Sequence, residues 1–317
     1  MQHIFIVNPT AGKGKVQNEI VKQIEEYFAD AQNYKIYITK KAGEGKEIAE
    51  REVKTGEPIR FYACGGEGTV FEILNGIIGY DNVSLATIPC GSANDFLKFF
   101  GDKELFLDIK EMVEGEPIFI DLIKANEFYC INQCSVGMDA IVAREMQKFK
   151  TWPLVSGSMA YKLAVIKVFF GKVGLKIKIM VDDIDKGIKD CLFAVCANGP
   201  VYGGGYTSAP YASPFDKKLD WLIVENMPKL EILSYLKKYE AGTHIGLKCC
   251  EYANCTNMEI SADKPFPLNL DGEIIMRDNV RFELVPNAMQ FIVPKSVAEK
   301  FKVEQDFSPK DLILNIK

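Results

Sequence analysis

Histidine is scarce in this chain, which has only His3 and His244 among its 317 residues. A Ser-His-Asp or Cys-His mechanism would have to use one of these two, and neither lies in a recognisable nucleophile motif. The nine cysteines include no Cys-x-x-Cys spacing, and most of them fall in apolar segments. Their odd number and the shortage of histidine favour reduced, mostly buried thiols over a metal site or a disulfide framework.

Long apolar runs are missing as well, since no stretch approaches the roughly 18 residues that a membrane-spanning helix needs. The N-terminus has no basic region and enters a predicted strand directly, so we expect no secretory signal and a cytoplasmic protein. The net charge of −5 argues against broad nucleic-acid binding, and no nucleic-acid partner is expected. At 317 residues the chain is long enough for two domains.

Two common phosphate-binding motifs are also absent. There is no Gly-x-x-x-x-Gly-Lys-Ser/Thr, and Gly66-Glu67-Gly68 lacks the third glycine of the dinucleotide fingerprint. What is present is an extended segment at 60–64, then Gly65-Gly66-Glu67-Gly68-Thr69, then a helix with apolar residues at helical spacing. Its glycines let a ligand approach the backbone, and the N–H groups at the helix start favour an anion. Taken alone, the segment fits a plain strand-to-helix connection equally well.

The first 120 residues alternate predicted strands and helices, which indicates a parallel sheet covered by helices. Strands are expected at residues 4–7, 35–39, 59–64 and 83–89. Polar or glycine-rich turns follow all four strands, at 8–15, at Thr39, at 65–69 and at 91–95. These turns fall at the carboxyl edge of the sheet, where ligands bind in such folds. Ser92 and Asp95 match a capping box for the segment that follows.

From about Ile118 the pattern changes to short strands, which predicts a mainly antiparallel β-sandwich. A hairpin is expected at 119–131, and helices are expected at 140–149, 158–169 and 230–239. Further strands are expected at 176–181, 191–197, 219–224, 257–261, 267–270 and 280–285. We assign residues 1–118 to the first domain and 119–293 to the second, and expect the tail 294–317 to pack back on the first.

Together these motifs resemble the diacylglycerol kinase catalytic family of lipid kinases, which is distantly related to NAD kinases and phosphofructokinases. Residues 8–12 are similar to its first-strand loop, and residues 65–72 match Gly-Gly-Asp-Gly-Thr-x-x-Glu at all but one place. Residues 88–96 match Ile-Pro-x-Gly-Thr-x-Asn-Asp-Phe, and residues 271–273 match Asp-Gly-Glu. The resemblance covers nearly the whole chain. It implies an α/β domain with an NAD-kinase/phosphofructokinase-like parallel sheet, followed by a β-sandwich that binds the lipid acceptor.

The resemblance implies ATP-dependent phosphorylation of a lipid hydroxyl, with diacylglycerol as the first expectation and a role in phospholipid biosynthesis. ATP would lie between the two domains, with Mg²⁺ neutralising its phosphates. The implied metal ligands are Glu67 and Asp95. The implied nucleotide-binding residues are Asn8, Pro9, Thr10, Ala11, Gly12, Thr39, Gly65, Gly66, Glu67, Gly68, Thr69, Glu72, Ser92, Asn94 and Glu273.

By the same resemblance Asp271 is the general base that takes the proton from the lipid hydroxyl. Its local pattern alone favours a simpler interpretation, because Asp-Gly is the commonest hairpin turn signal. The accompanying motifs reverse that preference. Asp216 corresponds to a family aspartate that holds a structural Mg²⁺, but Lys217 replaces the glycine of the family's Asp-Asp-Gly.

Two departures from the family pattern lie near the glycine turn. Glu67 replaces an aspartate, and its extra methylene moves the carboxylate by about 1.5 Å. Phe71 stands where an asparagine is common. Besides a diacylglycerol kinase, two alternatives stay open. One is a kinase for another acceptor, such as a long-chain base or other diol, and the other is a catalytically weak nucleotide- or lipid-binding homologue.

A lipid substrate implies that the protein is peripheral to a membrane surface. Residues 152–155 are Trp-Pro-Leu-Val, and lysines alternate with large apolar residues over 162–178. This pattern fits an interfacial face or, equally, a packing helix followed by a strand with solvated lysines. The glycine-rich segment 199–206 is interpreted as a loop near the acceptor pocket or as an ordinary surface turn. A homodimer is left open.

Overall fold

The computed structural model describes residues 1–91, 94–150, 152, 157–171 and 173–303. Ser92, and Pro153, Leu154, Val155 and Lys172 of the proposed interfacial face, lie outside the described residues. The chain forms two compact units, Met1–Leu122 with Pro286–Lys317 and Ile123–Val285, here called the first and second units. Their boundaries fall within β5 (Glu116–Ala125) and β13 (Glu273–Val293), two long strands that each continue from one unit into the other.

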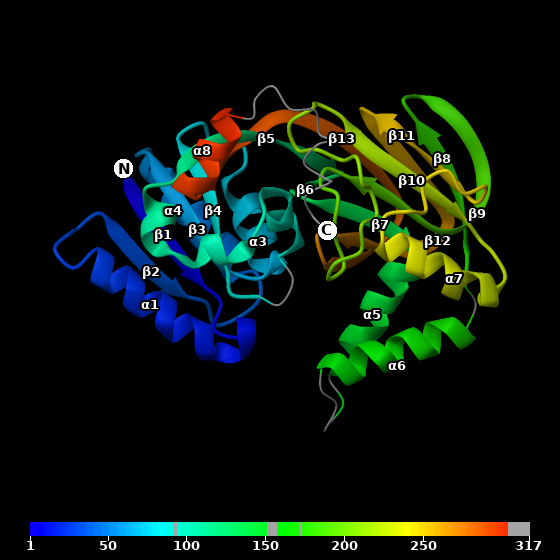
Figure 1. Ribbon diagram of the computed structural model, residues 1–317, viewed down its shortest axis with the longest axis horizontal. Coiled ribbons are helices and arrows are strands. Elements are labelled where there is room, and N and C mark those ends of the chain that lie inside the picture. Colours follow the sequence, from blue (N-terminus) through cyan, green and yellow to red (C-terminus); the bar gives the residue numbers. More distant parts are fainter. Residues whose placement is uncertain (92–93, 151, 153–156, 172, 304–317) are drawn as a thin grey trace. The chain divides into compact units, whose positions relative to one another are not determined.

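The first unit contains the parallel sheet that the alternating pattern predicts. Its strand order is β2-β1-β3-β4-β13, with all four pairings parallel (Figure 1). The strands are β1 (Gln2–Val7), β2 (Tyr34–Ile38), β3 (Ile59–Gly65) and β4 (Val83–Pro89), with Phe291 and Ile292 of β13 beside β4. Every residue of β3 and β4 is buried, as expected for central strands covered on both faces.

The helices of the first unit connect these strands. They are α1 (Lys15–Tyr27), α2 (Glu44–Glu52), α3 (Glu67–Ile77), α4 (Ile109–Val113) and α8 (Lys295–Val303), with short 3₁₀ turns at Ala11–Gly14, Val53–Thr55, Asp95–Phe100 and Lys103–Leu107. Ile20 and Ile24 are buried on the inner face of α1, whereas Tyr27, the last residue of the helix, is 40% exposed. The Ser296 N–H of α8 donates to Glu111 Oε2 of α4 at 3.0 Å. The remainder of the expected tail, residues 304–317, lies outside the described residues.

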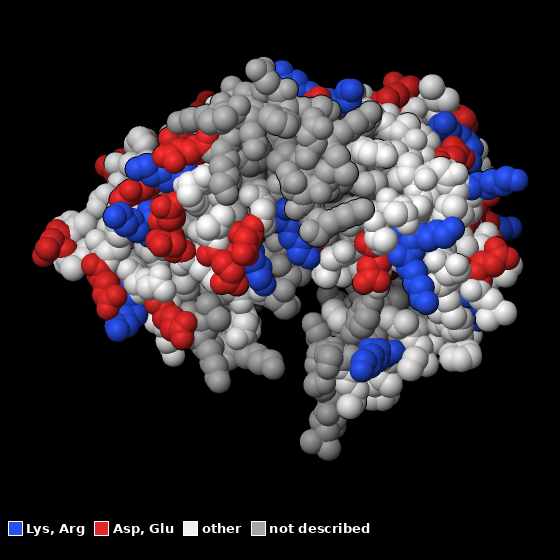
Figure 2. Space-filling model, viewed as in Figure 1, with Lys and Arg blue, Asp and Glu red and all other residues white. Residues whose placement is uncertain are grey.

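The core of the first unit accounts for one of the two histidines. The ring of Tyr62 stacks on Phe5 at 4.1 Å between centroids, and its hydroxyl lies 2.8 Å from His3 Nδ1. Burial, followed by the charge of Arg60, lowers the pKa of His3 to about 4. His3 is therefore a neutral core residue at neutral pH. On the surface, Figure 2 shows acidic and basic side chains intermingled over the described residues of this unit.

The second unit is antiparallel throughout its described pairings. Its strand order is β11-β10-β9-β7-β12-β13, and β8 pairs with both β9 and β12. The elements are β6 (Phe128–Cys130), β7 (Gln133–Gly137), β8 (Leu175–Val181), β9 (Ile184–Ala197), β10 (Leu219–Glu225), β11 (Cys250–Cys255), β12 (Asn257–Leu270), α5 (Met138–Lys150), α6 (Gly157–Phe170) and α7 (Lys229–Glu240). The two strands expected at 257–261 and 267–270 are a single strand with a shift of register between Ser261 and Phe266. Strands β7 and β11 were not predicted.

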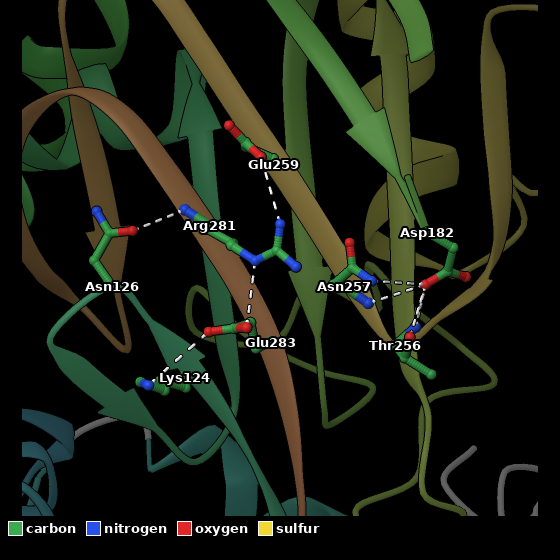
Figure 3. Close-up of polar contacts among 8 residues, drawn as sticks. All are labelled: Lys124, Asn126, Asp182, Thr256, Asn257, Glu259, Arg281 and Glu283. Carbon is green, nitrogen blue, oxygen red and sulfur yellow. Dashed lines mark hydrogen bonds and ion pairs between the residues drawn. The ribbon is translucent and has the colours of Figure 1, made fainter. Parts of the chain in front are cut away.

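Polar contacts hold the hairpins of the second unit in register (Figure 3). Asp182, in the β8–β9 turn with a φ of 46°, accepts hydrogen bonds from the Thr256 N–H at 2.8 Å and the Asn257 N–H at 3.1 Å. On β13, the Arg281 guanidinium lies 3.3 Å from Glu283 and 3.6 Å from Glu259. The three side chains are about 40% exposed, so each ion pair contributes at most about 1 kcal/mol. The contact at Asp182 instead joins two separate hairpin turns.

All nine cysteines are free, and seven are buried. Only Cys249 and Cys250 are partly exposed, with their sulfurs 3.9 Å apart. The expectation that most of the thiols are buried is confirmed. None of the described helices has the length and apolar character that crossing a bilayer requires.

Candidate active site

The glycine turn of the first unit joins β3 to α3, as predicted. Gly65 ends the strand, and Gly66 is the extended N-cap residue of α3, with φ −96° and ψ −169°. The N–H groups of Thr69 and Val70 donate to the Gly66 carbonyl at 3.0 and 3.3 Å, and the N-cap residue, a glycine, supplies no side-chain cap. The first turn of α3 therefore presents its backbone dipole and N–H groups at the carboxyl edge of the sheet, an arrangement suited to a phosphate.

Steric limits distinguish the glycines of this turn. A Cβ on Gly65 would lie 2.2 Å from Thr69 Oγ1, and a Cβ on Gly91 would lie 2.7 Å from Gly66 Cα. Among the described residues, the nearest atom to a Cβ on Gly66 would be Gly91 Cα at 3.8 Å. The fold itself therefore requires glycine at 65 and 91, whereas residue 66 has space for a side chain unless a ligand fills it.

Three of the predicted motifs meet at this edge. The Gly65 carbonyl accepts the N–H groups of Cys90 at 3.1 Å and Gly91 at 3.2 Å, and the side-chain amide of Asn94 at 3.2 Å. From the first-strand loop, Asn8 Nδ2 donates to Thr69 Oγ1 at 3.3 Å. Asn94 is 4% exposed, and its Oδ1 has no hydrogen-bond partner among the described residues. That buried acceptor is a polar atom that a nucleotide could satisfy.

The predicted capping box depends on Ser92, outside the described residues. The 3₁₀ turn that begins at Asp95 has Asn94 as its N-cap residue, in the left-handed conformation with a φ of 54° and without a side-chain cap.

Asn8 shapes the first-strand loop. Its Oδ1 accepts the Thr10 N–H at 3.0 Å and the Thr10 hydroxyl at 2.8 Å, while Pro9 and Thr10 are exposed. Ala11 begins a 3₁₀ turn, and Gly12 has a φ of 57°. Thr39 is buried, with its hydroxyl donating to the Val7 carbonyl at 3.4 Å.

Glu72 has a structural contact that the motif did not reveal. Its two carboxylate oxygens accept the N–H groups of Gly43 at 2.7 Å and Gly45 at 3.0 Å, at the start of α2. An acidic group at a helix N-terminus is stabilising. Glu72 therefore joins α3 to α2, which gives the residue a role in the fold whatever it does toward a nucleotide.

The two metal-ligand candidates of the first unit lie side by side. Glu67 Oε1 accepts the backbone N–H of Asp95 at 3.0 Å, and the Asp95 carboxylate pairs with Lys98 Nζ at 2.7 Å. The described residues contain no group of three or more His, Cys, Asp and Glu side chains placed to hold a metal ion. Mg²⁺ bound with substrate phosphates needs only one or two protein carboxylates, so the pair Glu67 and Asp95 would be enough to hold it there.

Asp216 lies in the second unit. Its Oδ1 accepts the Lys218 N–H at 3.1 Å. Lys217, which stands in place of the family's glycine, has a φ of 58° in the left-handed region. The turn thus keeps a conformation that glycine favours, at a cost of about 1 kcal/mol.

Asp271 is a turn residue and a buried carboxylate at once. With Gly272 it connects β12 to β13, and φ values of 49° and 94° fit the type I′ turn that Asp-Gly predicts. Its carboxylate accepts three successive backbone N–H groups, from Ile131 at 2.6 Å, Asn132 at 3.1 Å and Gln133 at 2.8 Å. The hairpin interpretation is confirmed, and it does not exclude a catalytic role for the side chain.

Burial sets the basicity of this carboxylate. Asp271 is 8% exposed, and burial raises its pKa to about 6, although the three N–H bonds act in the opposite direction. The group is ionised at neutral pH and is more basic than an ordinary aspartate. A general base works best when its pKa lies near the working pH.

Amide side chains hold the segment 131–133, which donates the three N–H groups to Asp271. Asn198 Nδ2 donates to the Ile131 carbonyl at 2.8 Å, and Asn132 Nδ2 donates to the Val201 carbonyl at 3.0 Å. Gln133 Nε2 donates to the Gly199 carbonyl, and its Oε1 accepts the Ser208 hydroxyl at 2.6 Å. The glycine-rich segment 199–206 thus accepts hydrogen bonds from the side chains of two of the residues that hold Asp271.

Sequence reasoning missed these amides. The polar pair Asn132-Gln133 between two apolar strand segments was the one available signal. Glu273, the first residue of β13, is exposed in the same hairpin. His244 is fully buried beside the Ser208 carbonyl, at 3.0 Å from its Nε2, and burial lowers its pKa.

Comparison with known proteins agrees with this arrangement. Residues 2–125 match the "Diacylglycerol kinase catalytic domain", and residues 132–293 match the "YegS C-terminal NAD kinase beta sandwich-like domain". YtlR of Bacillus subtilis (strain 168), which carries a provisional lipid-kinase name, is 27% identical over 315 residues, 92% of this chain and 99% of its own length. The diacylglycerol kinase of the same organism is 25% identical over 300 residues, 93% of this chain and 97% of its own length.

A solved structure from Bacillus anthracis str. Sterne, described provisionally as a diacylglycerol kinase, shares the fold. Its TM-score is 0.73 at 21% identity, and the match covers 93% of this chain and 98% of that chain. An N-terminal α/β unit of the diacylglycerol kinase type and a C-terminal antiparallel β-sandwich are therefore both present, and the chain belongs to the diacylglycerol kinase catalytic-domain family of lipid kinases.

Proposed function

We propose that this protein transfers the γ-phosphoryl group of ATP to the hydroxyl of diacylglycerol, giving phosphatidic acid. Membership of the lipid kinase family supports the reaction, and similarity to the diacylglycerol kinase of Bacillus subtilis supports the acceptor. The observation that carries the proposal is the Asp271 carboxylate, which is buried, fixed by three N–H donors and tuned to a pKa of about 6.

In the first unit the chain's own contribution is to bind and orient phosphates. Backbone N–H groups of residues 65–68 and the start of α3 would hold them, with Thr10 and Thr69 as hydroxyl donors and Asn94 as a partner for the nucleotide. Glu67, with Asp95, would hold the metal. Mg²⁺, when bound, neutralises charge on the triphosphate as it is transferred.

In the second unit Asp271 would act on the acceptor. The lipid hydroxyl loses its proton to the carboxylate as its oxygen forms the new bond to the γ-phosphorus, while the bond from that phosphorus to the β–γ bridging oxygen breaks. The N–H groups of residues 131–133 fix the orientation of the carboxylate. That orientation costs no reorganisation at the moment of transfer.

One observation favours the alternative of a weakly active homologue. The carboxylate of Glu67 already accepts the Asp95 N–H, and Asp95 is already paired with Lys98. Both candidate metal ligands are thus engaged within the protein. A metal would have to bind at their remaining oxygen lone pairs.

An acceptor panel in mixed micelles tests the proposal. With ATP and Mg²⁺, we expect transfer to diacylglycerol that exceeds transfer to a long-chain base and to a soluble diol. Transfer to one of the other acceptors alone would replace diacylglycerol with that acceptor. Saturable ATP binding without transfer to any acceptor would favour the weakly active homologue.

A further inference from the structure

Two adjacent cysteines of the second unit differ from the other thiols of the chain. Cys249 and Cys250 are partly exposed, whereas each of the other seven cysteines is at most 3% exposed. The two sulfurs lie 3.9 Å apart. Because a reagent must reach a thiol before it can react with it, Cys249 and Cys250 form the accessible thiol pair of the protein.

A structural metal site does not explain this pair. Structural zinc sites take four cysteine, histidine or carboxylate ligands. In the part of the chain that the structure describes, no three or more such side chains are placed to hold a metal ion. Two neighbouring thiols can instead exchange with a small disulfide, a reaction that needs no further protein ligand.

The pair lies where the edge strand β11 begins. Cys249 is in a turn, in which the Cys250 N–H donates to the Leu247 carbonyl at 2.9 Å. Cys250 is the first residue of β11 and lies opposite Val224 of β10. The Cys249 carbonyl accepts the N–H of Glu225, also at 2.9 Å. Both polar groups of the peptide bond between the two cysteines are therefore hydrogen-bonded.

A disulfide between these neighbours would strain that peptide bond. Disulfides usually join Cα atoms roughly 4.4–6.8 Å apart, but consecutive Cα atoms are about 3.8 Å apart across a trans peptide. Twisting the peptide to close the ring would turn the Cys249 carbonyl away from Glu225, and the Cys250 N–H away from Leu247. Since a strained disulfide is readily reduced, the oxidation would be reversible.

One of the two thiols also contacts the core of the second unit. The Cys250 thiol lies 3.7 Å from the Tyr235 hydroxyl of α7. Tyr235 stacks on Tyr239 at 5.8 Å between ring centroids, and the Tyr239 hydroxyl donates to the Tyr202 hydroxyl at 3.2 Å. Tyr202 belongs to the glycine-rich segment 199–206. A series of direct contacts therefore joins Cys250 to this segment.

We propose that Cys249 and Cys250 form a reversible redox switch, which a low-molecular-weight disulfide such as glutathione disulfide oxidises to a disulfide between the two residues. The Cys249 sulfur attacks one sulfur of the small disulfide, whose S–S bond breaks, and one glutathione leaves with the Cys249 proton. The Cys250 sulfur then attacks Cys249 in the mixed disulfide, and the second glutathione leaves with the Cys250 proton. The protein loses two electrons and two protons, which the small disulfide gains.

The environment of the pair sets the order of these steps. Burial raises the pKa of the Cys250 thiol to about 12, so this group is protonated at neutral pH. Cys249 is therefore the residue that attacks first, because the thiolate is the nucleophile. Cys250 reacts second, as the immediate neighbour of the mixed disulfide, where proximity favours the step. This inference goes beyond the proposed phosphoryl transfer and does not depend on it.

Equilibration of the full chain in glutathione redox buffers, followed by peptide mass spectrometry, tests the proposal. We expect one disulfide, between Cys249 and Cys250, which disappears when reduced glutathione is in excess. Cys250→Ser should stop the reaction at a mixed disulfide on Cys249, and Cys249→Ser should prevent both products. Cys255→Ala is the matched control, because Cys255 is buried at the other end of β11, and it should leave the disulfide unchanged.

Two buried thiol pairs provide an internal control. Cys130 is hydrogen-bonded to Cys134, and Cys196 to Cys255, but all four are buried. They should stay reduced in the folded protein and react only in denaturant. A disulfide in one of these pairs, or equal reaction of all nine cysteines in the folded protein, would overturn the proposal.

Hydrogen exchange measures the effect on the backbone. Oxidation should speed exchange of the Glu225 and Cys250 amides at least about tenfold, because both would lose their carbonyl partners. The same treatment should leave exchange in Cys249→Ser unchanged. Equal exchange of these amides in the oxidised and reduced wild type would overturn the switch, since the disulfide would then leave the start of β11 in place.

Phosphoryl transfer gives a second readout, which rests on the proposed function. Oxidation should lower kcat at least about twofold in the wild type through the contacts from Cys250 to segment 199–206, and Cys249→Ser should lose this response. Unchanged kcat in the fully oxidised protein would refute the link to that segment. No transfer by the fully reduced wild type would refute the proposed function instead, whereas the disulfide found by mass spectrometry would still support the redox site.

Discussion

The candidate site residues of the first unit differ in kind from those of the second unit. In the first unit, the proposed phosphate site is the backbone of the turn at residues 65–69, and its supporting loop begins about 25 residues later, at Cys90 and Gly91. In the second unit, one side chain bears the proposed chemistry. Its three N–H donors come from residues 138 to 140 positions away along the chain. The turn at residues 65–69 should therefore be sensitive to substitutions that add a side chain, whereas Asp271 should be sensitive to loss of its carboxylate.

The largest effect should come from removing the carboxylate. Asp271→Asn keeps the shape of the turn residue but cannot accept the acceptor's proton, so kcat should fall by roughly 10²–10⁴-fold. ATP affinity, measured by calorimetry without acceptor, should change little because the proposed role of the Asp271 carboxylate is to take a proton from the acceptor hydroxyl. Undiminished turnover by the variant would refute the assignment of Asp271 as the base.

Two neighbouring glycines test the backbone site. Gly65→Ala forces a Cβ to within 2.2 Å of Thr69 Oγ1, so it should lower the free energy of unfolding by about 1–3 kcal/mol. Gly66→Ala has 3.8 Å of clearance and should melt as the wild type does, but should bind ATP at least about tenfold more weakly if phosphate lies against it. If the folded Gly66→Ala variant binds ATP as the wild type does, the phosphates of ATP do not lie against this turn.

The pH dependence should reflect Asp271. Its carboxylate must be ionised to accept a proton, so kcat/KM should fall about tenfold per pH unit below about 6. The acidic limb of the pH profile should therefore give an apparent pKa near 6. An apparent pKa near 4 would indicate that burial does not raise the pKa of Asp271.

Stability should vary with pH in the opposite sense. Because the pKa of folded Asp271 lies above its ordinary value of 3.8, its stabilising contribution is fully present below about pH 4 and is lost as pH rises through about 6. Thermal melting at a series of pH values should show this slope. Asp271→Asn should reduce it, leaving the contribution of Asp220, whose pKa burial raises to about 7.

The smallest expected effect concerns Glu67. Glu67→Asp shortens the side chain by about 1.5 Å. Because it should bind Mg²⁺ more tightly, the Mg²⁺ concentration for half-maximal activity should fall by a few fold. Glu67→Gln is the matched control. It keeps the length of the side chain but removes its charge, so it should bind Mg²⁺ more weakly. Full activity of Glu67→Gln at the same Mg²⁺ concentration would exclude Glu67 as a metal ligand.

Local patterns predicted much of the fold. The alternating strands and helices of the first 90 residues, the turn between β3 and α3, and the Asp-Gly turn after β12 were all identified correctly, because each depends on neighbouring residues. Strands β7 and β11 were missed. Their cysteines, asparagine and glutamine do not alternate clearly, and they are strands because β9, β10 and β12 pair with them.

The sequence by itself determined that a glycine-rich turn would end a buried strand and begin a helix, since glycine content and apolar periodicity act over a few residues. It also placed Asp271 in a tight turn. Only the tertiary structure decided that Glu72 would bind the start of α2, that Asn94 would join the glycine turn, and that residues 131–133 would surround Asp271. These contacts join residues 27 to 140 positions apart, and which buried polar groups become partners depends on how the whole chain packs.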